Sequence, residues 1–160
     1  MATQRTIKYK TEDIFSVVMQ ESMYSAQTQE EEFQPVKPIT NDEQDIFRRL
    51  LKKAGIEVFK KMHRISADTS IPYDLSWDAA TGVDGDIGFT FIEPSHWSAT
   101  QYLAIDNHMR DAMVAYVLKE WYKMVKADYR YQEAEYQRQM DEINRMTRFN
   151  NTATITYRSF

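Results

Sequence analysis

The sequence predicts a mainly α fold: a helical bundle with long C-terminal helices, a small β-hairpin insertion and extended termini. All four glycines and all four prolines lie between residues 35 and 94, so residues 95–160 contain neither helix-breaking residue. In several segments apolar residues recur three or four positions apart, which is the period of an α-helix. A chain of 160 residues fits one domain and removes roughly 70% of its extended-state surface from water on folding. We therefore expect residues 1–160 to form a single domain.

Residues 1–39 are predicted to form an N-terminal helix and a linker. A short helix is expected from Thr11 to about Ala26, because its apolar side chains have helical spacing: Ile14, Phe15, Val18 and Met19. The polar segment QTQEEEFQPVKPI follows and contains two prolines. This composition is typical of a linker.

A second helix is predicted over residues 40–65. Thr40 and Glu43 have the spacing of a capping box, in which each side chain accepts a hydrogen bond from the backbone N–H of the other residue. At about 100° per residue, one face collects the apolar residues Phe47, Leu50, Leu51, Ala54, Val58, Met62 and Ile65. The opposite face collects a set of basic residues, namely Arg48, Arg49, Lys52, Lys53, Lys60 and Arg64.

Residues 66–97 are predicted to be a loop and β insertion. Pro72, Gly82, Gly85 and Gly88 separate short apolar stretches in this region. Residues 87–92 have the composition of one strand of a small hairpin.

Helices are predicted over residues 98–149. Ser98 and Gln101 form a second capping box, and an apolar stripe at helical spacing follows it. One straight helix over this range would be about 75 Å long at 1.5 Å per residue, which exceeds the width of a compact domain. We therefore expect a bend near Ala127 and Asp128; the alternative is a projecting helix that packs on neighbouring subunits.

Residues 150–160 are predicted to be an extended C-terminal arm. The segment TATITYRSF alternates Ala153, Ile155 and Tyr157 with threonines, which is the period of a β-strand. Such an arm needs a sheet edge, and this edge belongs either to the hairpin of the same chain or to a neighbour.

Composition restricts the environment and the partners of the chain. There is no cysteine, which excludes disulfides and thiolate metal sites and fits folding in a reducing cytoplasm. Neither a signal peptide nor a run of about 18 apolar residues is visible, so we expect a soluble protein with no membrane partner. The net charge of −4 argues against nucleic-acid binding by the whole surface.

Motifs that carry chemistry are missing from the sequence. His63, His96 and His108 do not have the spacing of a zinc motif. Asp84 and Asp86 flank Gly85, but EF-hand spacing is absent and a turn explains these residues better than calcium binding. There is no phosphate-binding loop and no nucleophile elbow. We therefore predict that the chain is not an enzyme and has no catalytic, cofactor-binding or metal-binding residues.

The basic face of residues 48–64 has three interpretations. A solvated helix face is the simplest. The second is contact with an acidic surface of a partner subunit, for instance the run of glutamates at residues 30–32 of a neighbouring copy. The third is nucleic acid, because cations spaced along one helix face follow a phosphate backbone.

The segment IDNHMRDAMVAYVLKEWYKMVKADYRYQEAEYQRQMDEINRMTRF resembles the C-terminal helical part of head-tail connector (adaptor) proteins of tailed bacteriophages. In that family a helix that ends in an aromatic Leu-x-x-Trp-Tyr segment, here residues 118–122, precedes a charged helix that bears tyrosines. The resemblance covers roughly residues 100–149 and consists of helix pattern and composition. It implies a connector-like domain without catalytic residues that forms a homo-oligomeric ring, usually a dodecamer, beneath the portal protein.

The resemblance also implies a place for the chain in the virion. It predicts a subunit at the head-tail junction, assembled in the cytoplasm of the bacterial host, that docks to the portal protein and to a downstream tail or ring protein. DNA would pass through the lumen of the ring without sequence-specific binding. We expect docking through aromatic and terminal residues, namely Trp97, Tyr129, Tyr136, Ile155, Tyr157 and Phe160. The alternative is a small helical nucleic-acid-binding or regulatory protein that uses the basic face of residues 48–64.

Overall fold

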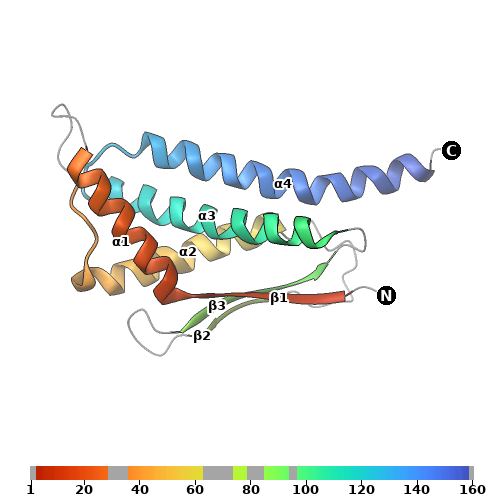
Figure 1. The fold of residues 1–160 in the computed structure, drawn as a ribbon, viewed down its shortest axis with the longest axis horizontal. Coiled ribbons are helices and arrows are strands. Elements are labelled where there is room, and N and C mark those ends of the chain that lie inside the picture. Colours follow the sequence, from red (N-terminus) through yellow and green to blue (C-terminus); the bar gives the residue numbers. More distant parts are fainter. Residues whose placement is uncertain (1–2, 29–35, 63–73, 79–84, 94–96, 159–160) are drawn as a thin grey trace.

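The computed structural model describes residues 3–28, 36–62, 74–78, 85–93 and 97–158, and within them it confirms a mainly helical fold with a small β-hairpin (Figure 1). The elements are β1 (Thr3–Lys10), α1 (Thr11–Thr28), a 3-10 turn (Asn41–Glu43), α2 (Gln44–Met62), β2 (Asp74–Asp78), β3 (Asp86–Glu93), α3 (Ala99–Met124) and α4 (Arg130–Arg158).

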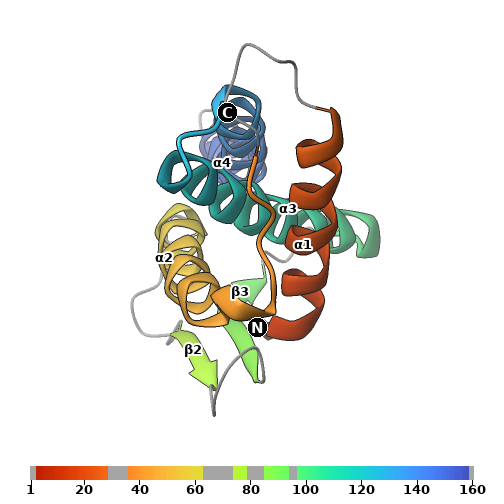
Figure 2. The same cartoon turned by 90° about the vertical axis from the view of Figure 1, so that its left-hand side faces the viewer.

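The helix α3 is the centre of the bundle, and α1, α2 and α4 all pack against it. Figure 2 shows α1 and α2 on opposite sides of the molecule, with α4 above α3. Side chains along α3 are fully buried, for example Ile105, Met109 and Met113, and Ile143 of α4 joins them in the core. The apolar stripe that predicted this helix therefore provides the core of the bundle.

Both predicted capping boxes are present. The N–H of Thr40 donates to Glu43 Oε2 at 2.8 Å, and the N–H of Ser98 donates to Gln101 Oε1 at 2.8 Å. The hydrogen bond from the hydroxyl of Thr40 lowers the pKa of the Glu43 carboxyl. Burial has a smaller effect in the opposite direction, so the pKa is lowered overall. A capping box depends on neighbouring residues alone, so these two helix starts could be predicted from sequence.

The predicted bend is confirmed, because α3 ends at Met124 and α4 begins at Arg130. Lys126 has φ of 58°, in the left-handed region that ends a helix, and the N–H of Ala127 donates to the carbonyl of Tyr122 at 2.9 Å. The two long helices are therefore joined by a short turn and lie antiparallel (Figure 1).

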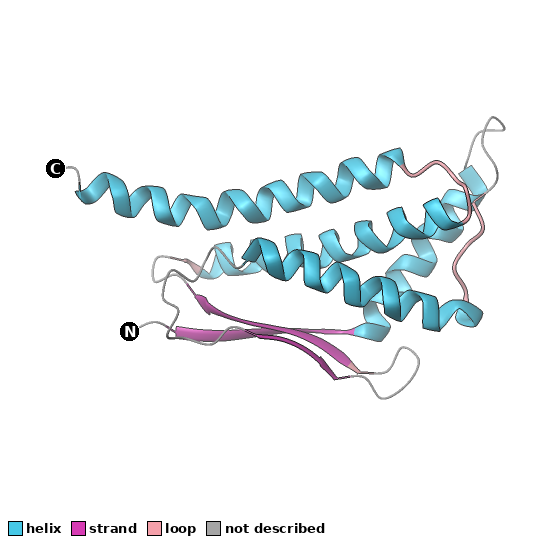
Figure 3. Ribbon diagram, turned by 180° about the vertical axis from the view of Figure 1, so that it is seen from behind, coloured by secondary structure: helices cyan, strands magenta, loops and turns pink. Residues whose placement is uncertain are grey.

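A three-stranded antiparallel sheet, in the order β1-β3-β2, packs beneath the helices (Figure 3). The hairpin β2-β3 was predicted, whereas the strand β1 was not. Among the described side chains of β1, Ile7 and Tyr9 are buried and alternate with exposed Thr6, Lys8 and Lys10, and this alternation is too short to signal a strand. Its formation depends on pairing with β3, for example Ile7 with Phe89, which lies far along the chain.

The prediction of an extended C-terminal arm was wrong, because α4 continues as a helix to Arg158. Residues 130–158 contain neither glycine nor proline, and each residue added to an existing helix gains one hydrogen bond. Ile155 and Tyr157 therefore lie in α4.

Candidate functional site

The basic face of α2 lies on the surface of the bundle. Arg49, Lys52, Lys53 and Lys60 are exposed, Arg48 is half-buried, and Arg64 lies outside the described residues. Ile56 is 37% exposed on the same face, four residues before Lys60 and three after Lys53. We call Arg49, Lys52, Lys53, Ile56 and Lys60 the basic row.

The basic row is only lightly paired within the described part of the chain. Lys60 Nζ lies 3.3 Å from Glu57 Oε1, one turn away on the same helix. Among the side chains that the structure describes, no carboxylate forms an ion pair with Arg49, Lys52 or Lys53. As far as the described residues go, these three cations are therefore open to a partner.

Three of the aromatic residues expected to dock a partner are engaged in the chain's own packing. Trp97 is 8% exposed, and its ring packs against Phe91 with centroids 6.1 Å apart. Tyr129 is half-buried, with Lys123 Nζ 4.8 Å from its ring centroid. Tyr136 is half-buried as well. Of the other candidates, the side chains of Ile155 and Tyr157 and the whole of Phe160 lie outside the description.

A lysine between two tyrosine rings joins α3 to α4. Lys119 Nζ lies 4.6 Å from the centroid of Tyr116 and 4.5 Å from that of Tyr136, and it is 3.4 Å from Glu120 Oε1. Burial, followed by the charge of Glu57, raises the pKa of Tyr136 to about 12. Cation–π contacts of this kind stabilise packed surfaces. Lys119 on α3 therefore contacts α4 through the ring of Tyr136.

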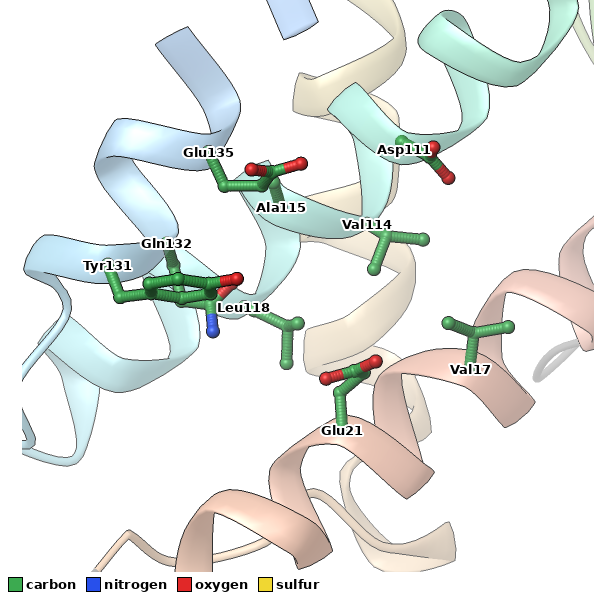
Figure 4. A pocket seen from close by; sticks show the side chains of 9 residues that line it. All are labelled: Val17, Glu21, Asp111, Val114, Ala115, Leu118, Tyr131, Gln132 and Glu135. Atoms are coloured by element: carbon green, nitrogen blue, oxygen red, sulfur yellow. The ribbon is translucent and has the colours of Figure 1, made fainter. Parts of the chain in front are cut away.

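An open groove of about 220 Å³ lies between α1, α3 and α4 (Figure 4). Its floor is apolar, and carboxylates project at its rim. No basic residue lines it. Tyr131 stands at the α4 side and is 75% exposed, which is the largest exposure of any large apolar side chain in the described part of the chain. We call this the acidic groove; α3 contributes Asp111, Val114, Ala115 and Leu118, α1 contributes Val17 and Glu21, and α4 contributes Tyr131, Gln132 and Glu135.

The three carboxylates of the acidic groove differ in their partners. Glu135 accepts hydrogen bonds from Arg138 (2.7 and 3.1 Å) and from Gln139 (2.8 Å), and the Arg138 guanidinium holds the pKa of Glu135 below its usual range. Asp111 lies 3.9 Å from Arg110 Nε, at the limit of an ion pair. Glu21 is exposed, and in Figure 4 its carboxylate points from α1 towards α3. The charges of Glu21 and Asp111 therefore dominate the rim.

A second cavity of about 320 Å³ lies where the start of α3 faces α4, with Trp97 and Met146 among its lining residues. Two of its polar side chains, His108 and Arg145, already have partners. Gln139 donates through its amide nitrogen to Glu135, so its oxygen faces His108 and accepts from Nδ1 at 2.7 Å. The guanidinium of Arg145, which also lines this cavity, is bonded to Glu142 at 2.6 and 3.0 Å. This arrangement places no nucleophile beside a base.

Metal and membrane sites are not found in the described part of the chain. No group of three or more His, Asp or Glu side chains there is arranged to hold a metal ion. Of the acidic residues near Gly85, Asp86 is described and half-buried, while Asp84 lies outside the description. None of the described helices is both long and apolar enough to cross a bilayer.

Comparison of the chain with protein-family models, with curated proteins and with solved structures gives no match. The function is therefore inferred from the chain's own surfaces. Sequence reasoning identified the four cations of the basic row but neither Ile56 nor the acidic groove. The groove is formed by helices that are distant in sequence, with Val17 and Glu21 on α1 and Tyr131 on α4. Within each helix, the one local sign of the groove is an exposed apolar side chain, Val17 or Tyr131, among polar residues.

Proposed function

We propose that this chain is a structural subunit of the head-tail connector ring of a tailed bacteriophage. In this role it docks to the portal protein on one side and to a tail component on the other, and the ring of subunits surrounds the DNA passage. The chain needs no catalytic residues to do so. The resemblance of residues 100–149 to connector proteins motivates the proposal.

The observation that carries the proposal is the length and placement of α4. This helix has 29 residues, or about 43 Å at 1.5 Å per residue. Figures 1 and 3 show that its C-terminal turns extend past the end of α3 and past the sheet. A helix that projects from its own bundle offers surface to a neighbouring subunit, as a ring protein requires.

The test is the mass of the purified chain in solution, combined with electron microscopy of any large species. The proposal predicts a closed ring, formed by the chain alone or in the presence of its virion partners. A variant that lacks residues 151–160 should assemble more weakly, while its circular dichroism should retain the signal of a folded helical bundle. An intact ring after this deletion would contradict a docking role for the projecting end of α4.

A second candidate function is a small helical nucleic-acid-binding or regulatory protein, and the exposure of the basic row favours it. Binding through four exposed cations would weaken steeply with salt, because each neutralised phosphate releases counterions. The test is fluorescence anisotropy with labelled DNA and RNA at low and high salt. Reversal of charge at Arg49, Lys53 and Lys60 should abolish binding; unchanged affinity would exclude this function.

A further inference from the structure

We propose that the acidic groove of one copy of this chain receives the basic row of a second copy, so that adjacent subunits join head to tail. This inference rests on the proposed ring function and names the contact that would build the ring. The charges of the two surfaces are opposite. Glu21 and Asp111 stand at the rim of the groove, and no basic residue lines it. The basic row presents four cations, and among the described residues the one carboxylate that pairs with them is Glu57, which contacts Lys60.

The basic row and the groove each combine an apolar centre with charged side chains beside it. Positions 49, 52, 53, 56 and 60 lie on one face of α2, because residues three, four, seven and eleven apart share a helix face. Ile56 therefore stands as an apolar residue with cations about one turn away on either side, at about 4.5 Å (Lys53) and about 6 Å (Lys60) along the axis. The groove has the complementary order, an apolar floor at Val114 and Leu118 with carboxylates beside it. Ile56 would contact this floor while its flanking cations face the rim.

The positions of the two surfaces favour a second copy as the occupant. Residues of α1 form one side of the groove, whereas the basic row lies on α2. Figure 2 shows these two helices on opposite sides of the molecule. One chain therefore cannot join its own two surfaces. A contact between two different surfaces of identical chains is heterologous, and such contacts generate rings when the rotation closes. Two copies of a single surface, by contrast, would stop at a dimer.

The first experiment exchanges the charges of the two surfaces. One variant carries Glu21→Lys and Asp111→Lys in the groove, and the other carries Arg49→Glu and Lys53→Glu in the row; all four positions are exposed. Like charges then face each other in each variant, so each alone should self-associate more weakly by about tenfold or more. An equal mixture of the two variants restores opposite charges at every contact. Light scattering should therefore show assembly in the mixture but not in its components.

The matched control reverses exposed acids outside the groove, with Glu133→Lys and Asp141→Lys on α4. This variant has the same change in net charge as the groove variant and should assemble as the unmodified chain does. If it fails to assemble, or if the mixture of groove and row variants stays dissociated, the inference is overturned.

The second experiment uses the lack of cysteine in the chain, which makes introduced thiols unique. Ile56→Cys is mixed under mild oxidation with Val17→Cys, a groove position, or with Leu103→Cys, an exposed position of α3 outside the groove. The inference predicts faster formation of the disulfide-linked dimer with Val17→Cys. Equal rates for the two pairs would overturn it.

The outcomes separate the inference from the proposed function. A ring that forms and ignores the charge reversals overturns the groove contact and leaves the ring subunit in place. A chain that gives no selective cross-link and remains monomeric at every concentration, both alone and with its virion partners, overturns both.

Discussion

Substitution of Trp121 by phenylalanine tests how the bundle holds the segment that precedes α2. Trp121 is 3% exposed, and its Nε1–H donates to the carbonyl of Lys37 at 2.7 Å. An indole has two more carbon atoms than a phenyl ring, and at roughly 0.8 kcal/mol per buried carbon their loss costs about 1.6 kcal/mol. The lost hydrogen bond adds about 1 kcal/mol. Trp121→Phe should therefore lower the free energy of unfolding by about 2.5 kcal/mol, or the melting temperature by about 5 to 10 °C.

The assay is urea denaturation followed by far-ultraviolet circular dichroism, which does not depend on the removed fluorophore. Trp97→Phe is the matched control, because Trp97 is also buried, its described contact is ring packing against Phe91, and no indole hydrogen bond of Trp97 is found among the described residues. In the Trp97→Phe variant the free energy of unfolding should fall by about 1.6 kcal/mol, from the loss of the two carbon atoms alone. Equal losses for the two variants would refute the assignment of about 1 kcal/mol to the bond with Lys37.

Three further predictions concern the packing of α3 against α4. Lys119→Met should lower the free energy of unfolding by about 1 to 2 kcal/mol in a denaturation experiment, because two ring contacts of the ammonium are lost while the methylene chain stays; an unchanged midpoint would show that these contacts contribute nothing. Ile143→Ala removes a fully buried side chain and should cost about 2 to 5 kcal/mol, whereas the exposed change Gln137→Ala should stay within about 0.5 kcal/mol. The pKa of Tyr136 is raised from 10.0 in the unfolded chain to about 12, so its protonated form stabilises the fold fully below pH 10 and this stability is lost as pH rises towards 12. Titration at 295 nm with melting curves should show the loss of stability over that range; a melting temperature that is constant between pH 10 and 12 would contradict the shift.

Features that depend on neighbouring residues could be predicted from the sequence. The capping boxes at Thr40 and Ser98 involve residues three positions apart, so their hydrogen bonds follow from local geometry. The apolar faces of the helices likewise follow from a period of 3.6 residues. The bend near Ala127 was predicted from length alone, because an unbroken helix would exceed the domain.

Features that depend on distant partners could not be predicted. The alternation in residues 152–157 fits a strand, but a strand forms only where it pairs with another strand, and in the structure these residues instead continue the helix α4. The acidic groove depends on the relative placement of three helices. Glu21 and Asp111 are 90 residues apart in sequence, and no pattern in either helix indicates that they share a rim.

The junction of β1 and α1 joins the sheet directly to a helix of the bundle. No residue separates Lys10, the last of the strand, from Thr11, the first of the helix, and the N–H of Thr11 donates to the carbonyl of Gly85 at 3.1 Å. This bond ties the first residue of α1 to the residue that precedes β3, and α1 carries Val17 and Glu21 at one wall of the groove. We therefore expect changes at the β1–β3 pairing to be felt at the groove through α1, although the groove is lined by helices alone.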